Sequence, residues 1–315
     1  MSVLWHTSAS HSEWAPSTHT PTPSQEPITA RFSLISTGTE RLVSRGRVPE
    51  SAFDAMRVPN MAGDFNFPLN YGYSLVGLDP HGQAVHCLHP HARQAWLEAG
   101  DSIALPASAP LDRMTLTSNL ETAMNAAWDA EVGAGDEALI CGFGTVGALL
   151  ALTLRLAHGI EATIVEQNRF RADVARELGF ETQDGRNDPA SYSLMFNASG
   201  SQNGLQWCLD HAAFEARVIE LCWYGSTPVT VNLGGAFHFN RVRLVSSQVG
   251  HVAPSKRHTL AARDRRAAAI DLLTDAAFDA LPREHVPFDD VPAFFDTLRA
   301  GTLPNGLFWI IDYGA

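Results

Sequence analysis

A glycine-rich turn between an apolar strand and an apolar helix constrains the fold of this chain more than any other feature. Residues 138–141 predict a buried strand, and Gly142-Phe-Gly-Thr-Val-Gly147 leads from it into a predicted helix over 145–157. In such a turn the first glycine makes a tight bend, the second lets the backbone approach a pyrophosphate, and the third allows close helix–strand packing. The phosphates lie at the helix N-terminus. The pattern predicts dinucleotide binding at Gly142, Gly144, Thr145, Val146 and Gly147.

An acidic residue follows at the position where such a unit binds a ribose. Glu166 ends the next predicted strand, 19 residues after Gly147, where a carboxylate binds both ribose hydroxyls. The same carboxylate repels the 2′-phosphate of NADP, whereas Arg169 and Arg171 close by weaken that preference. We therefore expect NAD as the cofactor, with NADP as the alternative. A glycine turn in a doubly wound domain that binds nothing is the other interpretation.

The order of predicted elements indicates an α/β chain of two domains. From about residue 123 to 263 strands alternate with helices, as in an open parallel sheet covered on both faces. Residues 28–106 show short apolar runs broken by Gly and Pro, which are typical of a β-rich domain. An aromatic-rich strand at Leu307–Tyr313 has no place in the parallel sheet and is expected to return to the first domain. The predicted domains are 1–122, completed by 264–315, and 123–263.

Three local expectations accompany this organisation. Residues 6–26, rich in Ser, Thr, Pro and His, predict an exposed connection after a short opening strand at Val3–Trp5. A helix at Gly204–Ala213 and a strand at Arg217–Trp223 are predicted in the second domain. Glu40 and Arg41 are expected to pair with each other or with neighbouring residues, as solvated charges usually do.

Charge and composition exclude several partners. Asp plus Glu number 34 against 22 Lys plus Arg, a formal net charge of −12, and a nucleic-acid or anionic-membrane binder needs a basic face. The longest uncharged apolar stretch, Ala138–Leu154, is broken by glycines and does not predict a membrane span. No secretory signal is visible, and the four cysteines are scattered without a C-x-x-C pair. We expect a cytoplasmic protein whose partner is a small molecule.

Five further segments form a familiar set together with the glycine turn. They lie at Ile35–Glu40, Pro68–Gly77, Asn197–Gly200, Leu221–Gly225 and Pro287–Gly301. In this order they resemble the early zinc-ligand loop, the Pro…Gly-His-Glu…Gly segment, two cofactor-side strand ends and the return segment of the medium-chain dehydrogenase/reductase superfamily, which joins a GroES-like β-rich catalytic domain to a Rossmann domain. Within it, Ser36–Arg41 is most similar to bacteriochlorophyllide dehydrogenases and to short relatives. The resemblance implies this fold, an NAD(P) cofactor, and a place for Ser199 and Gly200 beside that cofactor.

The chain departs from the family at the metal. Zinc members place Cys, His and Glu where this sequence has Thr37, Tyr73 and Ser74, and neutral hydroxyls are weak ligands beside thiolate, imidazole or carboxylate. Glu121 stands where some zinc members keep a ligating carboxylate, but one carboxylate does not hold zinc alone. We therefore expect no metal.

The resemblance and this departure lead to one functional expectation. We expect a zinc-independent, NAD(P)-dependent oxidoreductase that transfers hydride between nicotinamide and a carbonyl, a secondary alcohol or an activated alkene. The alternative is a catalytically inactive dinucleotide-binding protein that serves as a sensor or assembly subunit. Substrate identity is not readable from the sequence, because fold does not imply function.

Thr39 and Tyr73 are the candidate catalytic residues. A carbonyl or alkene that takes up hydride must also take up a proton, and without zinc a hydroxyl is the obvious donor. By the resemblance, Thr39 matches the position that relays protons in zinc members, and Tyr73 replaces a zinc-binding His. For Tyr73 the alternative is that its ring fills the space the metal vacated.

Two further expectations concern metal binding and assembly. The segment His86-Cys87-Leu-His89-Pro-His91 presents several potential metal ligands, but Pro90 interrupts the strand and we favour edge or interface histidines over a metal site. Relatives usually dimerise by pairing the last Rossmann strand across a two-fold axis, which here falls near Arg241–Ser247. We therefore expect a homodimer.

Overall fold

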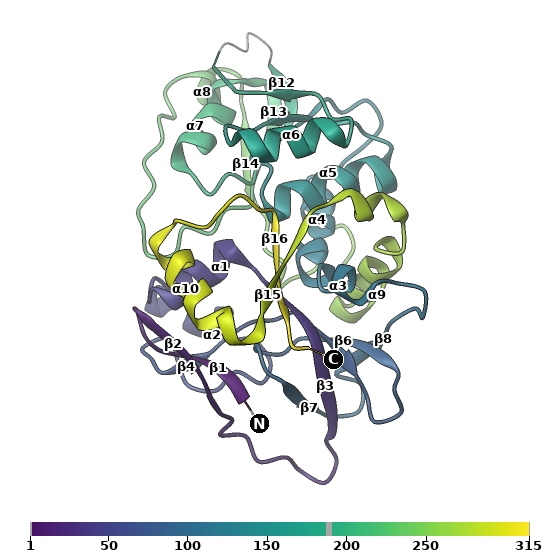
Figure 1. Ribbon diagram of the computed structural model, residues 1–315. Helices are drawn as coiled ribbons and strands as arrows, with labels where there is room; N and C mark the ends of the chain where they lie inside the picture. The colour runs from purple at the N-terminus through teal and green to yellow at the C-terminus, as the bar shows by residue number, and fades with distance from the viewer. Residues whose placement is uncertain (1, 187–190, 315) are drawn as a thin grey trace. The chain divides into compact units, whose positions relative to one another are not determined.

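The chain divides into two compact units, each with its own sheet. A computed structural model describes residues 2–186 and 191–314 (Figure 1). The first unit comprises Met1–Ser118 together with Ile270–Ala315, and the second comprises Asn119–Ala269. Among the described residues no helix combines the length and apolarity that a membrane span requires.

The first unit is β-rich and contains two sheets, whose ten strands are given with their bounds below. The larger is a mixed sheet of seven strands in the order β15-β16-β3-β5-β6-β8, and its seventh strand, β7, pairs with β3. The smaller has three strands in the order β2-β1-β4. Its core unites residues from both ends of the chain, including Leu4, Leu75, Phe295 and Ile311. Its strands are β1 (Ser2–Ser8), β2 (His11–Pro16), β3 (Glu26–Ile35), β4 (Leu69–Asn70), β5 (Leu75–Leu78), β6 (Ala84–Cys87), β7 (Gln94–Leu97), β8 (Ser102–Ala104), β15 (Arg283–Pro287) and β16 (Phe308–Asp312).

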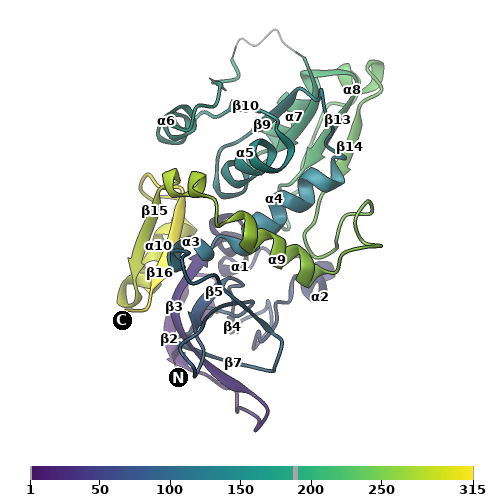
Figure 2. The ribbon, with the colours of Figure 1, turned by 90° about the vertical axis from the view of Figure 1, so that its right-hand side faces the viewer.

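Short helices complete this unit. They are α1 (Thr37–Ser44), α2 (Phe53–Met56), α3 (Leu111–Met114) and α10 (Val291–Ala300), with 3-10 turns at Glu50–Ala52, Ala276–Ala280 and Phe288–Asp290. Figure 2 shows α10 beside β15 and β16.

The C-terminal strand returns to the first unit, as predicted. β16 runs antiparallel to β3, with Ile310 opposite Leu34. It also pairs in parallel with β15. Aromatic and β-branched residues favour strands, and the ten-residue β3 provides a long antiparallel partner for β16.

The expected exposed connection at residues 6–26 is wrong in its first half. β1 continues to Ser8, and β2 forms a hairpin with it in which Leu4 lies opposite Trp14. Ser12 is buried and pairs with His6, whose pKa burial lowers to about 3. The polar composition of this stretch hid the strand because its inward position is a serine rather than an apolar residue.

The second unit is a doubly wound α/β domain, which confirms the predicted fold class. Its six strands are all parallel and are ordered β11-β10-β9-β12-β13-β14. The order reverses beside β9, because the chain steps outward to β10 and β11 and then crosses back to β12. Ligands bind at the carboxyl ends of the strands at such a reversal. The strands are β9 (Ala138–Cys141), β10 (Thr163–Val165), β11 (Thr182–Gln183), β12 (Tyr192–Asn197), β13 (Ala212–Glu220) and β14 (Arg243–Ser246).

Helices α5, α6, α7 and α8 each connect two of these parallel strands, whereas α4 precedes the sheet in the chain and α9 follows it. Helix α5 packs against β9 (Figure 2). Residues Gly147–Leu154 of α5 are all buried, and the helix ends at Gly159 in the left-handed conformation. The helices are α4 (Thr117–Asp129), α5 (Thr145–His158), α6 (Arg169–Glu177), α7 (Gln202–Asp210), α8 (Ala236–Phe239) and α9 (Ala262–Leu272). The predicted helix at Gly204–Ala213 thus ends earlier, since β13 already begins at Ala212.

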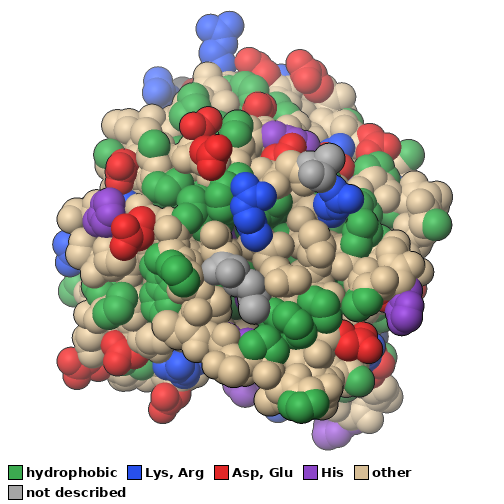
Figure 3. All heavy atoms as spheres, turned by 60° about the horizontal axis from the view of Figure 1, so that its bottom comes forward, with side chains coloured by type: hydrophobic (Ala, Val, Ile, Leu, Met, Phe, Trp, Pro, Cys, Tyr) green, Lys and Arg blue, Asp and Glu red, His purple; other side chains and the backbone are tan. Residues whose placement is uncertain are grey.

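None of the four cysteines forms a disulfide. The thiols of Cys141 and Cys208 lie beside each other in the second unit. On the face drawn in Figure 3, Lys and Arg side chains stand singly among acidic ones rather than gathering into a patch.

Candidate functional site

The turn between β9 and α5 has the geometry that a pyrophosphate requires. Gly142 has φ +99°, and a Cβ there would lie 2.6 Å from the Cα of Ser199. A Cβ on Gly147 would lie 2.0 Å from the carbonyl oxygen of Gly142, so the helix packs closer to the strand than a side chain allows. At Gly144 the nearest atom is an Arg171 nitrogen at 3.7 Å, which leaves the middle of the turn open. The three glycines therefore fit the three roles expected for a dinucleotide.

The other residues predicted on the cofactor side surround this turn. Thr145 and Val146 form the first turn of α5, where the helix dipole favours an anion. Ser199 follows β12 and lies against Gly142, and its Oγ donates to Asn197 Oδ1 at 2.7 Å. The amide of Gly200 donates to Cys222 Sγ. All of these groups lie at the carboxyl ends of β9, β12 and β13.

Glu166 lies beside the same turn. It follows β10, and its Oε2 accepts a hydrogen bond from the amide of Phe143 at 2.7 Å. Its Oε1 accepts from the amide of Asn168 at the start of α6. Among the described residues no carboxylate pairs with the Arg171 guanidinium, which reaches over Gly144. A carboxylate and an unpaired guanidinium thus flank the position expected for the adenosine ribose.

In the first unit a buried hydrogen-bonded chain anchors α1, the helix that carries Thr39. Glu40 Oε2 accepts from His91 Nε2 at 2.8 Å, and Glu40 Oε1 accepts from the amide of Ser36. Ser33 Oγ lies 2.8 Å from His91 Nδ1 and 2.9 Å from the Tyr313 hydroxyl. Burial raises the pKa of Tyr313, so its hydroxyl remains a donor. Glu40 therefore pairs with a neighbouring residue, as expected, but the expectation that it is solvated is wrong, because its side chain is fully buried.

The loop that carries Tyr73 rests on the same imidazole. Gly72 has φ +120°, and a Cβ there would lie 2.9 Å from His91 Nε2. The rings of Tyr71 and Tyr73 meet edge to face at 6.1 Å. Thr39 and Tyr73 are both half-buried. The structure therefore brings the two predicted catalytic segments together on the Glu40–His91 pair, a connection that sequence analysis missed because the partners lie far apart in the chain.

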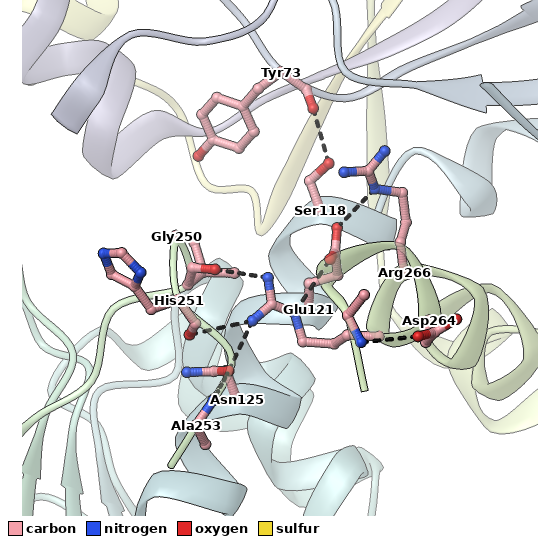
Figure 4. Close-up of polar contacts among 12 residues, drawn as sticks. Tyr73, Ser118, Glu121, Asn125, Gly250, His251, Ala253, Asp264 and Arg266 are labelled. Carbon is pink, nitrogen blue, oxygen red and sulfur yellow. Dashed lines mark hydrogen bonds and ion pairs between the residues drawn. The ribbon is translucent and has the colours of Figure 1, made fainter. Parts of the chain in front are cut away.

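Of the three residues at the positions where zinc members of the resembled family place ligands, Ser74 has its hydroxyl bonded within the protein and Tyr73 is bonded through its backbone carbonyl. Ser74 Oγ donates to the carbonyl of Thr115 at 2.6 Å and lies 2.9 Å from His86 Nε2. Tyr73 accepts at its carbonyl from Ser118 Oγ (Figure 4). Thr37 opens α1.

The histidine segment does not converge on one point. His86 faces Ser74, His91 faces Glu40, and His89 donates from Nδ1 to the carbonyl of Pro90. Burial lowers the pKa of His89 to about 4. Within residues 2–186 and 191–314, no three His, Cys, Asp or Glu side chains are placed to hold a metal ion.

Glu121 is neutralised by two arginines of α9. Its carboxylate oxygens lie 3.2 Å from Arg265 Nε and 3.2 Å from Arg266 Nε (Figure 4). Arg265 also donates to Asn125 Oδ1 at 2.7 Å and to the carbonyl of Val249 at 2.6 Å. The Glu121 and Arg265 side chains are about 95% buried, and a buried pair is costly to break. A cation would have to displace both guanidinium groups to use this carboxylate.

Comparisons with known proteins give the fold a name. No family model matches the chain. Over 95 residues it is 36% identical to an (R,R)-butanediol dehydrogenase of Neisseria gonorrhoeae, a stretch that covers 30% of this chain and about a quarter, 26%, of that enzyme.

Solved structures match it along nearly its whole length. An L-idonate 5-dehydrogenase of Escherichia coli K-12 superposes with a TM-score of 0.77 at 14% identity, over 99% of this chain and 98% of that one. An E. coli alcohol dehydrogenase in complex with NADH gives 0.76 at 13%, over 99% of each chain. An acetophenone reductase of Geotrichum candidum in complex with NAD gives 0.75 at 16%, over 99% and 96%. The chain thus has the fold of the medium-chain dehydrogenases, a GroES-like unit and a Rossmann unit, as the sequence resemblance implied.

Proposed function

We propose that this chain is a medium-chain oxidoreductase that uses NAD(P) and transfers hydride between the nicotinamide and a carbonyl or secondary alcohol of a small molecule. The observation that carries the proposal is the β9–α5 turn, where Gly142 and Gly147 exclude any side chain and the space over Gly144 is open. When bound, the nicotinamide supplies or accepts the hydride. Residues 123–263 hold the cofactor, and residues 1–122 with 264–315 provide the substrate side.

The names of the similar proteins support one class of substrate. The relative and the structures are named for oxidising alcohols such as butanediol and idonate, or for reducing a ketone. We therefore favour a carbonyl or secondary alcohol over an activated alkene. A cytoplasmic location remains a prediction.

We further propose that the reaction runs without zinc. Thr37, Tyr73 and Ser74 offer only neutral hydroxyls, and Ser74 is already bound to Thr115. Glu121 is balanced by Arg265 and Arg266. This donor set lacks the thiolate and imidazole ligands that zinc prefers.

A second candidate function is dinucleotide sensing without catalysis, which the loss of the zinc ligands favours. An assay of cofactor consumption distinguishes the oxidoreductase from the sensor. It uses purified protein with NADH or NADPH and a panel of ketones, aldehydes, enones and quinones. Turnover of any ketone or aldehyde supports the proposed reaction. Tight NADH binding with no turnover across the panel would support the sensor instead.

The cofactor preference tests the role of Glu166. Wild-type protein should bind NADH more tightly than NADPH, because the carboxylate accepts from ribose hydroxyls and repels a 2′-phosphate. Glu166→Ala should reduce or reverse the difference in affinity between NADH and NADPH. Without the carboxylate, the Arg171 guanidinium can bind the 2′-phosphate of NADPH and no negative charge repels it. Calorimetric titration of both cofactors measures this, with Glu181→Ala as the control, an exposed carboxylate whose loss changes the net charge equally. Equal affinities in the wild type would contradict the assignment.

The hydroxyl of Tyr73 is expected to stabilise and protonate the substrate oxygen together with Thr39. Removing one such donor costs about 10²–10³-fold in turnover. Tyr73→Phe keeps the ring, so turnover should fall while melting temperature and cofactor affinity stay unchanged. Tyr71→Phe is the matched control, because that buried hydroxyl donates to the carbonyl of Met56 and its loss should lower stability instead. Unchanged turnover in both Tyr73→Phe and Thr39→Val would refute the assignment.

We also propose that two copies pair along β14. This strand is at an edge of the parallel sheet, bonded to β13 on one side. An open edge is normally covered, and among the described residues Leu244 on β14, Phe214 on the adjacent β13 and Phe239 in α8 are large, exposed and apolar. Light scattering at micromolar concentration should give a dimer, and Leu244→Lys should give a monomer. A monomeric wild type would rule this arrangement out.

A further inference from the structure

A polar cluster stands at the carboxyl ends of β12 and β13, outside the contacts assigned above to the cofactor. Asn197 and Glu220 end these two strands and are partners in the parallel register. Partners in register project to the same face of a sheet, and their side chains meet: Asn197 Nδ2 donates to Glu220 Oε2 at 2.9 Å. Tyr224 and Cys222 follow β13 and complete the cluster.

The Glu220 carboxylate is held entirely by hydrogen-bond donors. Its Oε1 accepts from the amide of Cys222 at 2.7 Å, and its Oε2 accepts from the Tyr224 hydroxyl at 3.3 Å as well as from Asn197. Burial and the neighbouring Cys222 and Glu220 raise the pKa of Tyr224, so that hydroxyl stays a donor. Among the described residues no Lys, Arg or His forms an ion pair with Glu220. Its negative charge is therefore fixed in place and not neutralised.

The cluster is adjacent to the glycine turn. Ser199 lies against Gly142 and donates to Asn197 Oδ1, so one side chain separates the turn from the cluster. In a doubly wound sheet the adenosine half of a dinucleotide lies over one side of the reversal and the other half over the opposite side. Glu166 after β10 marks the adenosine side. The nicotinamide half must then extend over β12 and β13, toward Glu220.

We propose that Glu220, oriented by Asn197 and Tyr224, is a positioning residue that makes this protein hold NAD⁺ in preference to NADH. The oxidised nicotinamide ring carries a positive charge that the reduced ring lacks, and an unneutralised carboxylate nearby attracts it. Tighter binding of NAD⁺ than of NADH keeps the oxidised cofactor on the protein and favours release of the reduced one. By linkage it also lowers the reduction potential of the bound cofactor relative to the free one. This inference rests on the proposed function and adds to it the oxidation state of the cofactor that the protein holds.

Binding titrations of the wild-type protein and Glu220→Gln test the proposal, with NAD⁺, NADH and ADP-ribose as the three probes. The wild type should bind NAD⁺ at least as tightly as NADH. In Glu220→Gln the ratio of the dissociation constant of NAD⁺ to that of NADH should rise about fivefold, which is the effect expected from losing one charge pair at a solvated site. ADP-ribose lacks the nicotinamide, so its affinity should not change. Glu215→Gln is the control, because Glu215 lies on the same strand, exposed and paired with Arg241.

The outcomes separate this inference from the proposed function. If the wild type binds ADP-ribose and both nicotinamide forms, but Glu220→Gln leaves their ratio unchanged, the role of Glu220 is wrong and the cofactor site stands. Tighter binding of NADH than of NAD⁺ by the wild type overturns the inference without any variant, even if Glu220→Gln fails to fold. If the wild type binds none of the three probes, the proposed function fails, and this inference with it.

Discussion

The buried hydrogen bond between Glu40 and His91 is the interaction on which the first unit depends. It joins α1 to the segment between β6 and β7, which contains His91. His91 is also hydrogen-bonded to Ser33, and Ser33 to Tyr313, which follows the C-terminal strand. A carboxylate taken out of water is costly unless donors surround it, and here the Ser36 amide and His91 provide them. Because Gly72 packs on the same imidazole, the positions of Thr39 and Tyr73 follow from this one pair.

In the second unit the corresponding constraint is the reversal of strand order at β9. It places a glycine turn between two carboxylates, Glu166 after β10 and Glu220 at the end of β13. The two differ in what they face. Glu166 lies on the side expected for a ribose, where we propose that its carboxylate favours NAD over NADP. Glu220 lies on the side expected for nicotinamide, where its charge distinguishes the two oxidation states.

Features with a local signal were predictable from the sequence. The Gly142–Gly147 turn and Glu166 have a fixed spacing, and the aromatic strand near Leu307–Tyr313 was recognisable by its composition. Strand β2 was not, because Ser and Pro mask its alternation. The pairs that organise each unit, Glu40 with His91 and Glu121 with Arg265, join residues far apart in the chain and leave no pattern in either segment. The same holds for Asn197 and Glu220, whose contact depends on strand register.

We propose that the substrate side works through hydroxyls and buried hydrogen bonds rather than through a metal. Elemental analysis of protein purified without added metal, combined with an activity assay before and after dialysis against a chelator, decides this. The protein should contain well under one zinc per chain and should keep its activity after the chelator. One zinc per chain that resists dialysis, or activity that is lost with the metal and returns with zinc, would contradict it.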